Sequence, residues 1–292
     1  METMESIAAS FSQYIQQIGY SKTSQYQICS SVKEFLAFVS KANSQEQSPR
    51  INNITQQDIL NFYQYLQTRP LKRRAGVLSQ TMIQHYLYGL KTFFSWLEQT
   101  QHLRYNPMSN LKFKRPENTP REPLSQQQIK KLFKTATTAK QRAILHLFYS
   151  CGLRRTEAEN LNTSDIHFGE NLLYVRQGKG AKRRVIPINE RVKKDLEHYY
   201  NTERTKTNHQ AFMLNRTNER MSGQSYNKAL KELTRASKID KPTTLHHLRH
   251  SIATHLLENG LSIEFVRDFL GHSHLEATQI YAKVRAKQLK HL

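Results

Sequence analysis

The sequence has little cysteine and no long apolar segment. Its only cysteines, Cys29 and Cys151, lie far apart and have no metal-ligand spacing, which favours a reducing compartment over a disulfide-stapled secreted fold. No stretch approaches the roughly 18 to 20 apolar residues that span a bilayer. The start, METMESIAAS, lacks the basic and apolar regions of a signal peptide. We therefore expect a soluble, cytoplasmic protein with no membrane partner.

Acidic residues are also scarce relative to basic ones. The 292 residues contain 44 Lys plus Arg against 23 Asp plus Glu, a formal net charge of +21. From Leu111 to the end there are 34 basic and 17 acidic residues, so +17 of that charge lies in the C-terminal part. Such an excess is typical of nucleic-acid binders, although membrane-surface and ribosomal proteins share it. We expect the C-terminal part to hold most of an anionic partner.

Hydrophobic residues make up 37% of the chain and its length suits about two domains, which excludes a disordered protein. Helical periodicity covers the first hundred residues. Capped helix starts are expected at Thr55, with Asp58 three residues later, and at Ser79. One amphipathic stripe is formed by Tyr26, Cys29, Val32, Phe35, Leu36 and Val39. We predict a helical domain over residues 1–110.

Two basic segments interrupt or follow these helices. The loop RPLKRRAG carries Arg69, Lys72, Arg73 and Arg74, which form either a solvated charge run or a set of phosphate contacts. The segment KFKRPENTPREP has three prolines, which suppress both helix and sheet hydrogen bonds. We predict an interdomain linker over residues 111–123 whose Lys112, Lys114 and Arg115 run along a phosphate backbone.

A second domain is predicted over residues 124–292. Ser125 and Gln128 have the capping-box spacing, and Gly152 is a plausible end of the following helical stretch. NLLYVRQGKGAKRRVIPIN alternates on both sides of a Gly-Lys-Gly turn, which predicts a β-hairpin with Lys179 near its tip. Helices return beyond Arg191. The expected fold class is mainly α with a small antiparallel sheet.

The stretch LHHLRH, residues 245–250, gathers three histidines and one arginine. His246 and His250 share a helical face at the spacing of a zinc pair, yet His246 and Arg249 share a face as well. A guanidinium beside a metal ion would be unfavourable, whereas beside a phosphate it would be favourable. The stretch also lacks the glutamate of an HExxH helix and a nearby cysteine, and a zinc reading would leave Arg249 unexplained. We favour a phosphate site and expect no metal.

Five short stretches in this order, CGLRRTE, GKGAKRR, LHHLRH, LGHSH and TQIYAKV, resemble motifs of the tyrosine recombinases, the phage-integrase family that includes the Xer proteins. The resemblance implies a SAM-like helical N-terminal domain and an α+β catalytic domain that form a C-shaped clamp around duplex DNA. It also implies the two-domain plan of Xer-like enzymes. The activity it implies is site-specific recombination through a 3′-phosphotyrosine intermediate, without metal, ATP or another cofactor.

The same resemblance assigns the site residue by residue. The catalytic positions are Arg154, Lys179, His246, Arg249, His272 and Tyr281, with Tyr281 as the nucleophile. The supporting positions are Glu157 and His250. The family commonly has a small apolar residue where Arg155 stands, and the spacing to Glu157 favours Arg154 as the site arginine. The neighbouring Lys182, Arg183 and Arg184 are expected at DNA backbone or water.

The residue types suit phosphoryl transfer independently of the family. Negative charge develops on the non-bridging oxygens, and two guanidinium forks can stabilise it. A phenol with a pKa near 10 is a weak nucleophile, so cations and a proton acceptor such as His246 are needed. The leaving 5′-oxygen needs a proton that lysine can give and arginine cannot, which suits Lys179.

The expected partner is duplex DNA with an inverted-repeat core site, bound by a homo- or heterotetramer. Two alternatives remain open. One is a DNA-binding regulator or scaffold that has the fold but does not cut. The other is a type IB topoisomerase-like enzyme that only relaxes DNA.

Overall fold

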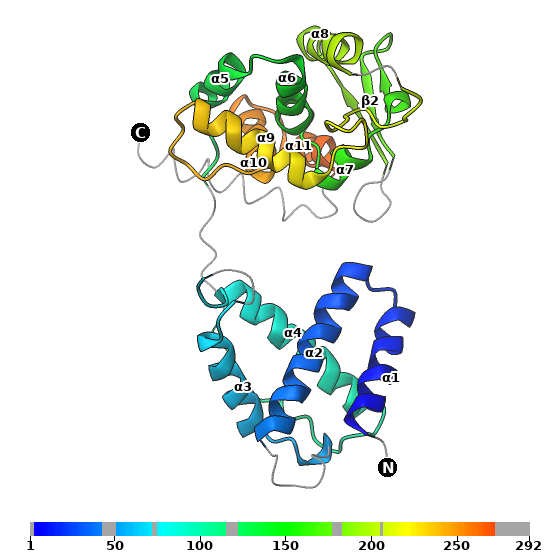
Figure 1. Ribbon diagram of the computed structural model, residues 1–292, viewed down its shortest axis with the longest axis vertical. Coiled ribbons are helices and arrows are strands. Elements are labelled where there is room, and N and C mark those ends of the chain that lie inside the picture. The colour runs from blue at the N-terminus through cyan, green and yellow to red at the C-terminus, as the bar shows by residue number, and fades with distance from the viewer. Residues whose placement is uncertain are drawn as a thin grey trace. The chain divides into compact units, whose positions relative to one another are not determined.

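The computed structural model describes residues 3–42, 51–71, 75–114, 122–176, 183–204 and 207–271 (Figure 1). The chain divides into two compact units, residues 1–119 and 120–292, and each is described by itself. The predicted linker spans this division.

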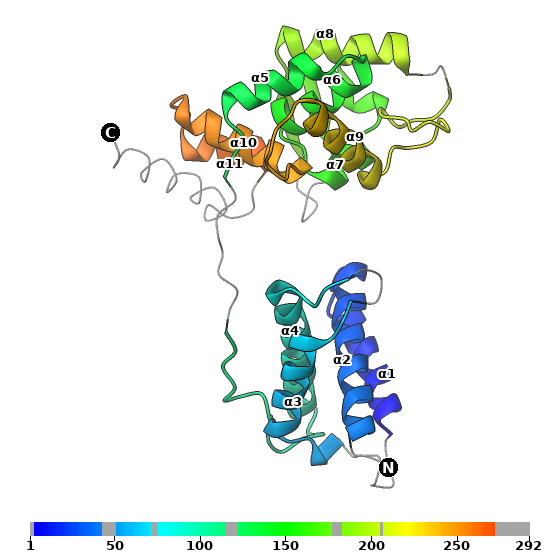
Figure 2. The same ribbon diagram turned by 60° about the vertical axis from the view of Figure 1, so that its left-hand side comes forward.

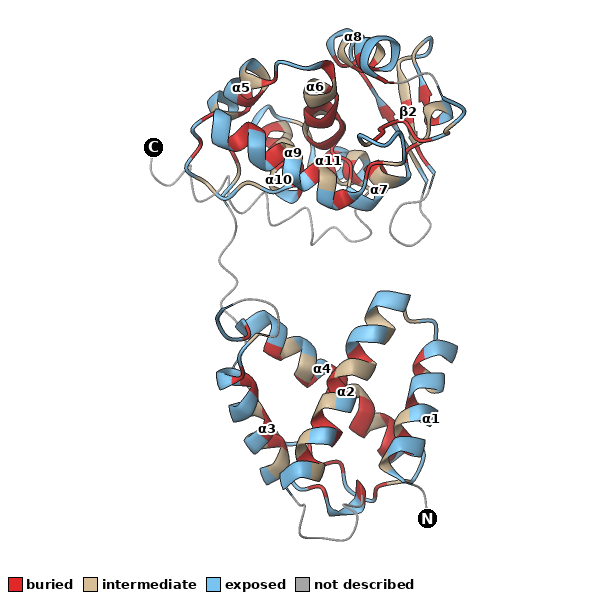
Figure 3. Ribbon diagram, viewed as in Figure 1, coloured by how far each residue is buried: buried red, intermediate tan, exposed pale blue. Residues whose placement is uncertain are grey.

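The first unit is helical, and its two central helices are α2 and α4. Helix α1 packs against α2, and α3 packs against both central helices (Figure 2). The elements of this unit are α1 (Met4–Gln17), α2 (Lys22–Ala42), the 3-10 turn η1 (Ile51–Asn53), α3 (Gln56–Thr68) and α4 (Gln80–Gln99). Figure 3 shows buried residues on the facing sides of these helices.

The predicted helix starts of the first unit are confirmed. Thr55 caps α3 and forms a capping box with Asp58, and the Ser79 side chain caps α4. The predicted stripe of α2 is wrong at Tyr26, which is 76% exposed, whereas Ile28 is buried. An α-helix turns about 100° per residue, so Tyr26 and Ile28, two residues apart, lie on roughly opposite faces of α2.

Residues 111–114, which lie in the predicted linker, pack against the first unit. Leu111 and Phe113 pack against its core, and the ring centroids of Phe113 and Tyr63 lie 4.9 Å apart. The carbonyl of Lys114 accepts a hydrogen bond from Gln84 at 2.8 Å. Lys112 and Lys114 themselves are exposed. The segment therefore alternates, with its apolar residues inward and its lysines outward.

The second unit packs its helices around α6, which contacts α5, α8 and α9 (Figure 1). The elements before the sheet are α5 (Gln126–Thr135), α6 (Ala139–Leu145), the π-helical turn η2 (His146–Ser150), α7 (Arg155–Asn160) and the 3-10 turn η3 (Thr163–Asp165). The elements after it are α8 (Glu190–His198), the π-helical turn η4 (Tyr199–Glu203), α9 (Gly223–Ala236), α10 (Leu245–Glu258) and α11 (Ile263–Leu270). The predicted capping box of Ser125 and Gln128 at the start of α5 is confirmed.

A small sheet lies in the second unit. The strands β1 (Ile166–His167), β2 (Leu172–Val175) and β3 (Arg184–Pro187) pair antiparallel in that order. In the β2–β3 register, Leu173 faces Ile186, and both are fully buried. The predicted hairpin is confirmed, although β1 was not foreseen. The hairpin tip with Lys179 lies outside the described residues.

The fold class is thus confirmed as mainly helical with a small antiparallel sheet. Within the described part of the chain, no helix is both long and apolar enough to cross a membrane.

Candidate active site

Glu157, on the short helix α7, is the centre of the candidate site. Its side chain is 1% exposed. Arg154 is the residue before the helix, and its backbone N–H donates to one carboxylate oxygen at 2.8 Å while its Nη1 donates to the other at 2.7 Å. Arg155 points elsewhere, because its Nε lies 3.9 Å from Glu159 and half of its side chain is exposed. Helix geometry thus directs Arg154 to Glu157.

Arg184, the first residue of β3, also binds Glu157. Its Nη1 and Nη2 donate to the two carboxylate oxygens, each at 2.8 Å. Burial alone would raise the pKa of Glu157. The hydrogen bonds and charge of Arg184, with the donors of Arg154, outweigh that effect and lower the pKa to about 2. The carboxylate is therefore ionised throughout the physiological pH range.

Arg249 reaches the same carboxylate from α10. Its side chain is 6% exposed, and its Nη1 lies 3.9 Å from Glu157 Oε2. Nη1 also donates to the carbonyl of Gly152, and Nη2 donates to the carbonyl of Leu270 at 2.6 Å. A buried charge is tolerated only when it is paired and hydrogen-bonded, and both conditions hold here. The structure thus brings together Arg154, Glu157 and Arg249, from separate parts of the sequence.

Two glycines allow the close approach of these elements. Gly152 has φ +57°, and a Cβ at this position would lie 2.7 Å from the Leu270 side chain. Gly271 ends α11 in the left-handed conformation, with φ 64° and ψ 49°. Its carbonyl accepts a hydrogen bond from Arg154 Nη2 at 2.7 Å. The turn before α7 and the end of α11 are therefore joined by the site arginines.

The histidines of LHHLRH take different positions on α10. His246 is exposed and His250 is half-buried. His247 accepts a hydrogen bond at Nδ1 from the backbone N–H of Thr244, the N-cap, at 3.1 Å, which gives it a structural role. Among the residues that the structure describes, no group of three or more His, Cys, Asp or Glu could hold a metal ion. Lys179, His272 and Tyr281 lie outside the described residues.

The predicted DNA contacts divide by exposure. Lys112, Lys114 and Arg183 are exposed. Lys72, Arg73, Arg74, Arg115 and Lys182 lie outside the described residues. Two arginines differ from the expectation because their guanidiniums are buried in ion pairs. Arg69 is 9% exposed and its Nε lies 2.7 Å from Glu34, while the Arg184 side chain is 8% exposed and holds Glu157. Both therefore have interior roles.

Helix α9 carries a cationic face that none of the five sequence motifs includes. Lys228, Lys231 and Arg235 are all exposed, at steps of three and four residues that place them on one face. The opposite face contains Tyr226, Leu230 and Leu233, which are buried. The helical spacing of these basic residues, opposite the apolar ones, could have predicted this face from the sequence. The face is a further surface suited to phosphate groups.

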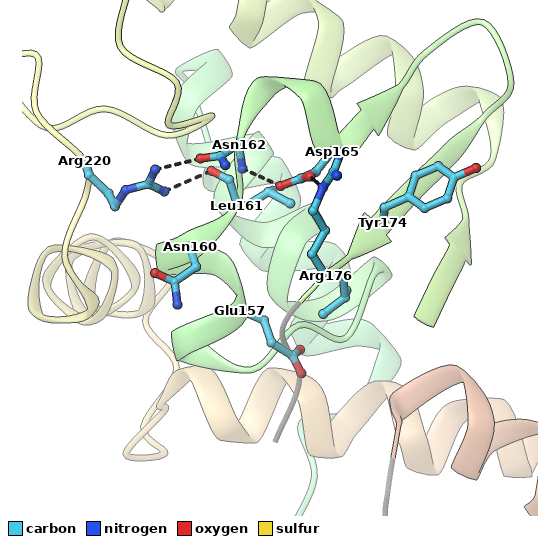
Figure 4. A pocket seen from close by; sticks show the side chains of 9 residues that line it. Glu157, Asn160, Leu161, Asn162, Asp165, Tyr174, Arg176 and Arg220 are labelled. Carbon is cyan, nitrogen blue, oxygen red and sulfur yellow. Dashed lines mark hydrogen bonds and ion pairs between the residues drawn. The ribbon is translucent and has the colours of Figure 1, made fainter. Parts of the chain in front are cut away.

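A polar cavity of about 270 Å³ has Glu157 and Asn160 of α7 in its wall (Figure 4). Arg176 binds the carboxylate of Asp165 in this cavity. Arg220 donates to the side chain of Asn162 and the carbonyl of Leu161, at 2.7 and 3.3 Å. These arginines join strand β2 and the segment before α9 to the residues after α7. They stabilise the segment that follows α7.

Comparison with known families identifies the class. Residues 122–288 match the phage integrase family, and residues 7–102 match the phage integrase N-terminal SAM-like domain. The first match alone covers more than half of the 292 residues. The chain belongs to the phage integrase family, a class of site-specific recombinases.

Relatives named as tyrosine recombinases align over nearly the whole chain. The tyrosine recombinase of Thermosipho africanus is 30% identical, with 96% of each chain covered. The tyrosine recombinase XerA of Pyrococcus furiosus is 34% identical, with 96% of this chain and 90% of the relative covered. A lambda integrase dimer bound to a COC′ core site has the same fold, with a TM-score of 0.75 at 17% identity over 96% of this chain and 77% of that one. The match therefore includes both units.

Proposed function

We propose that the chain is a site-specific recombinase that cuts and rejoins DNA through a 3′-phosphotyrosine intermediate. The observation that carries the proposal is the convergence of Arg154 and Arg249 on the buried carboxylate of Glu157. Two guanidiniums held at one carboxylate form a fixed positive site for a phosphodiester. The membership of the chain in the phage integrase family supports the same reaction.

The first step transfers a phosphoryl group from DNA to Tyr281. Its phenolic oxygen attacks phosphorus, the bond to the 5′-oxygen breaks, and a 3′-phosphotyrosyl link and a free 5′-hydroxyl result. His246 accepts the phenolic proton, and Lys179 donates a proton to the leaving oxygen. Arg154, Arg249 and His272 stabilise the charge on the non-bridging oxygens. His250 supports the site from α10.

The second step reverses the first with a different strand. The 5′-hydroxyl of that strand attacks the phosphotyrosyl phosphorus and displaces Tyr281. Each bond made replaces an equivalent bond broken, so no ATP is consumed. No metal ion takes part in this scheme, because guanidinium and ammonium groups supply the positive charge.

The Arg154 side chain is 19% exposed and so presents an edge to solvent, whereas Arg249 is more deeply buried. We propose that a phosphate first meets Arg154 and that a small local shift brings Arg249 to it. The exposed Lys112, Lys114 and Arg183 add contacts to the DNA backbone. Both units would then contact the same duplex DNA.

We further propose an inverted-repeat core site and a tetramer, of one or two kinds of subunit, that joins two such sites. A DNA recombinase of this kind acts at the nucleoid in the cytoplasm. The core site is supported by a solved lambda integrase that is bound to a core site as a dimer, and the tetramer is inferred from the recombinase family of the chain.

The test begins by selecting, from a pool of DNA sequences, the short duplex that the protein binds and protects. A nicked suicide version of that duplex traps cleavage, because the cut fragment diffuses away. We expect a covalent adduct on a denaturing gel, unaffected by a chelator. The adduct should be absent for Tyr281→Phe while DNA binding persists. Tyr200→Phe, at a tyrosine that is 40% exposed on η4, is the matched control and should retain the adduct.

The outcomes separate the alternatives. DNA binding without any adduct from the unaltered protein would indicate a regulator or scaffold. An adduct without strand exchange between two labelled duplexes would indicate a relaxing enzyme of the type IB kind. An adduct that survives Tyr281→Phe would refute the assignment of the nucleophile, and loss of activity with a chelator would revive a metal site.

A further inference from the structure

Three consecutive carbonyl oxygens at the end of α11 each accept a hydrogen bond from a different arginine. Arg184 Nε donates to Phe269 at 3.0 Å, and Arg249 and Arg154 donate to the next two carbonyls. The last carbonyls of a helix lack partners within the helix and carry the negative end of its dipole. The guanidiniums therefore satisfy both the hydrogen-bonding groups and the charge of this helix end.

Arg184 links this helix end to the carboxylate at the centre of the site. Its Nη1 and Nη2 bind the two oxygens of Glu157 while its Nε binds Phe269. With 8% of its side chain exposed, it is placed to bind protein rather than DNA. Its position on β3 also connects both partners to the hairpin that carries Lys179.

We propose that Arg184 is a positioning residue of the active site. It fixes Glu157, and through Glu157 it fixes the guanidiniums of Arg154 and Arg249. The same side chain anchors the end of α11, from which the chain continues in sequence to His272 and Tyr281. The strand β3, the two site arginines and the end of α11 thus act as one unit. This inference rests on the proposed recombinase function.

Only arginine suits this position. A guanidinium offers a planar fork for both carboxylate oxygens and a further donor for a carbonyl, whereas the ammonium of lysine is a compact point charge. The charged groups that face Glu157 from its neighbours are Arg154 at the start of its own helix, Arg249 on α10 and Arg184 on β3. Without Arg184, Glu157 keeps its burial and the hydrogen bonds from Arg154 but loses the two hydrogen bonds and the charge of Arg184, which contribute most to keeping it ionised.

The experiment compares Arg184→Gln and Arg184→Lys with the matched control Arg216→Gln, which removes an exposed arginine in the turn before residue 220. Single-turnover cleavage of the suicide duplex is measured at saturating DNA across pH 5 to 9, beside DNA affinity and melting temperature. We expect Arg184→Gln to cleave on the order of 10²-fold more slowly, since small displacements of site groups have effects of this size. DNA affinity should be unchanged, and Arg184→Lys should restore only part of the rate.

The pH profile distinguishes positioning from general stabilisation. In Arg184→Gln the fall in cleavage rate at acid pH should move to higher pH. Burial raises the pKa of Glu157, and in this variant only the Arg154 hydrogen bonds, without those of Arg184, counteract it. Adding Glu157→Gln removes the titrating group, so the shifted limb should disappear from the double variant. A purely structural role would lower the melting temperature without moving this limb.

Three results would overturn the inference. They are an Arg184→Gln rate equal to that of Arg216→Gln, a loss of rate that is the same at every pH, and a loss of DNA affinity with an unchanged rate. The last would mean that Arg184 contacts DNA. Failure of the unaltered protein to form an adduct would instead refute the proposed function, so the two failures are distinct.

Discussion

Arg154 donates from Nη2 to the carbonyl oxygen of Gly271, 117 residues later in the chain, at 2.7 Å. The same guanidinium donates from Nη1 to Glu157. One arginine therefore joins the start of α7 to the end of α11. The site depends on this geometry as much as on the charge of the side chain.

Replacing the site arginines by lysine should slow cleavage strongly while keeping DNA binding. Lysine retains the positive charge but cannot bind two acceptors in a plane. For Arg154→Lys and Arg249→Lys we expect cleavage rates about 10²- to 10³-fold lower, the range for loss of a transition-state donor. Arg155→Lys, next in sequence with its side chain 51% exposed, is the control and should cleave normally. A larger loss for Arg155→Lys would mean that Arg155 is the site arginine.

The stability contributed by Glu157 should depend on pH. Its pKa is lowered from 4.5 in an unfolded chain to about 2 in the fold, so its contribution is complete above pH 4.5 and is lost as pH falls toward 2. The shift corresponds to about 3 kcal/mol at most. Urea unfolding of the parent and of Glu157→Gln at pH 7, 4.5 and 3.5 measures it. The difference in the free energy of unfolding should be largest at pH 7 and should shrink below pH 4.5; a constant difference would contradict the pairing.

Alanine at Gly152 should destabilise the second unit more than alanine at another left-handed glycine. Gly152 has φ +57° and would crowd Leu270, whereas Gly260 has φ +89° and open space around its Cβ position. Backbone strain should cost about 1 to 2 kcal/mol at either position. Overpacking should add about 1 to 3 kcal/mol at Gly152 alone. Thermal unfolding of the two variants measures the difference, and equal losses would show that Leu270 moves aside freely.

Exposed and buried cations of the first unit should affect DNA binding differently. Binding should lose about 10³- to 10⁵-fold in affinity between about 50 and 200 mM salt if 6 to 10 phosphates are contacted. Removing Lys112 and Lys114 together should reduce the logarithmic salt slope by about 2. Lys194→Gln, at an exposed position on α8, is the control and should leave the slope unchanged.

Arg69→Gln should lower the stability of the first unit and leave the salt dependence of DNA binding unchanged. The Arg69 guanidinium is paired with Glu34 and donates a hydrogen bond to the Tyr86 hydroxyl at 2.8 Å, so its loss should destabilise the first unit. Breaking a buried pair costs about 3 to 5 kcal/mol. The salt slope of DNA binding should not change. A reduced slope together with normal stability would return Arg69 to the DNA surface.

Several local features could be predicted because short-range chemistry decides them. Thr55, Ser79 and Ser125 cap helices through their own side chains, and Gly271 supplies the left-handed end of α11. The β2–β3 hairpin followed from its alternation. The inward face of α2 was harder to predict from the sequence. Tyr26 and Ile28 are both apolar enough to be buried, and only packing against the neighbouring helices selects Ile28.

By itself, the sequence determined the order of the motifs, the helix caps and the cationic excess, because each depends on residue type and spacing. Tertiary structure alone decided that the Arg184 side chain lies in the interior, where it binds Glu157. Arg183 and Arg184 are equally basic neighbours, yet Arg183 is exposed while Arg184, the first residue of β3, binds Glu157 on α7. A buried carboxylate must be fully paired to stay ionised, and the chain meets that need with groups 27 and 92 residues away from Glu157. No local pattern encodes such distances.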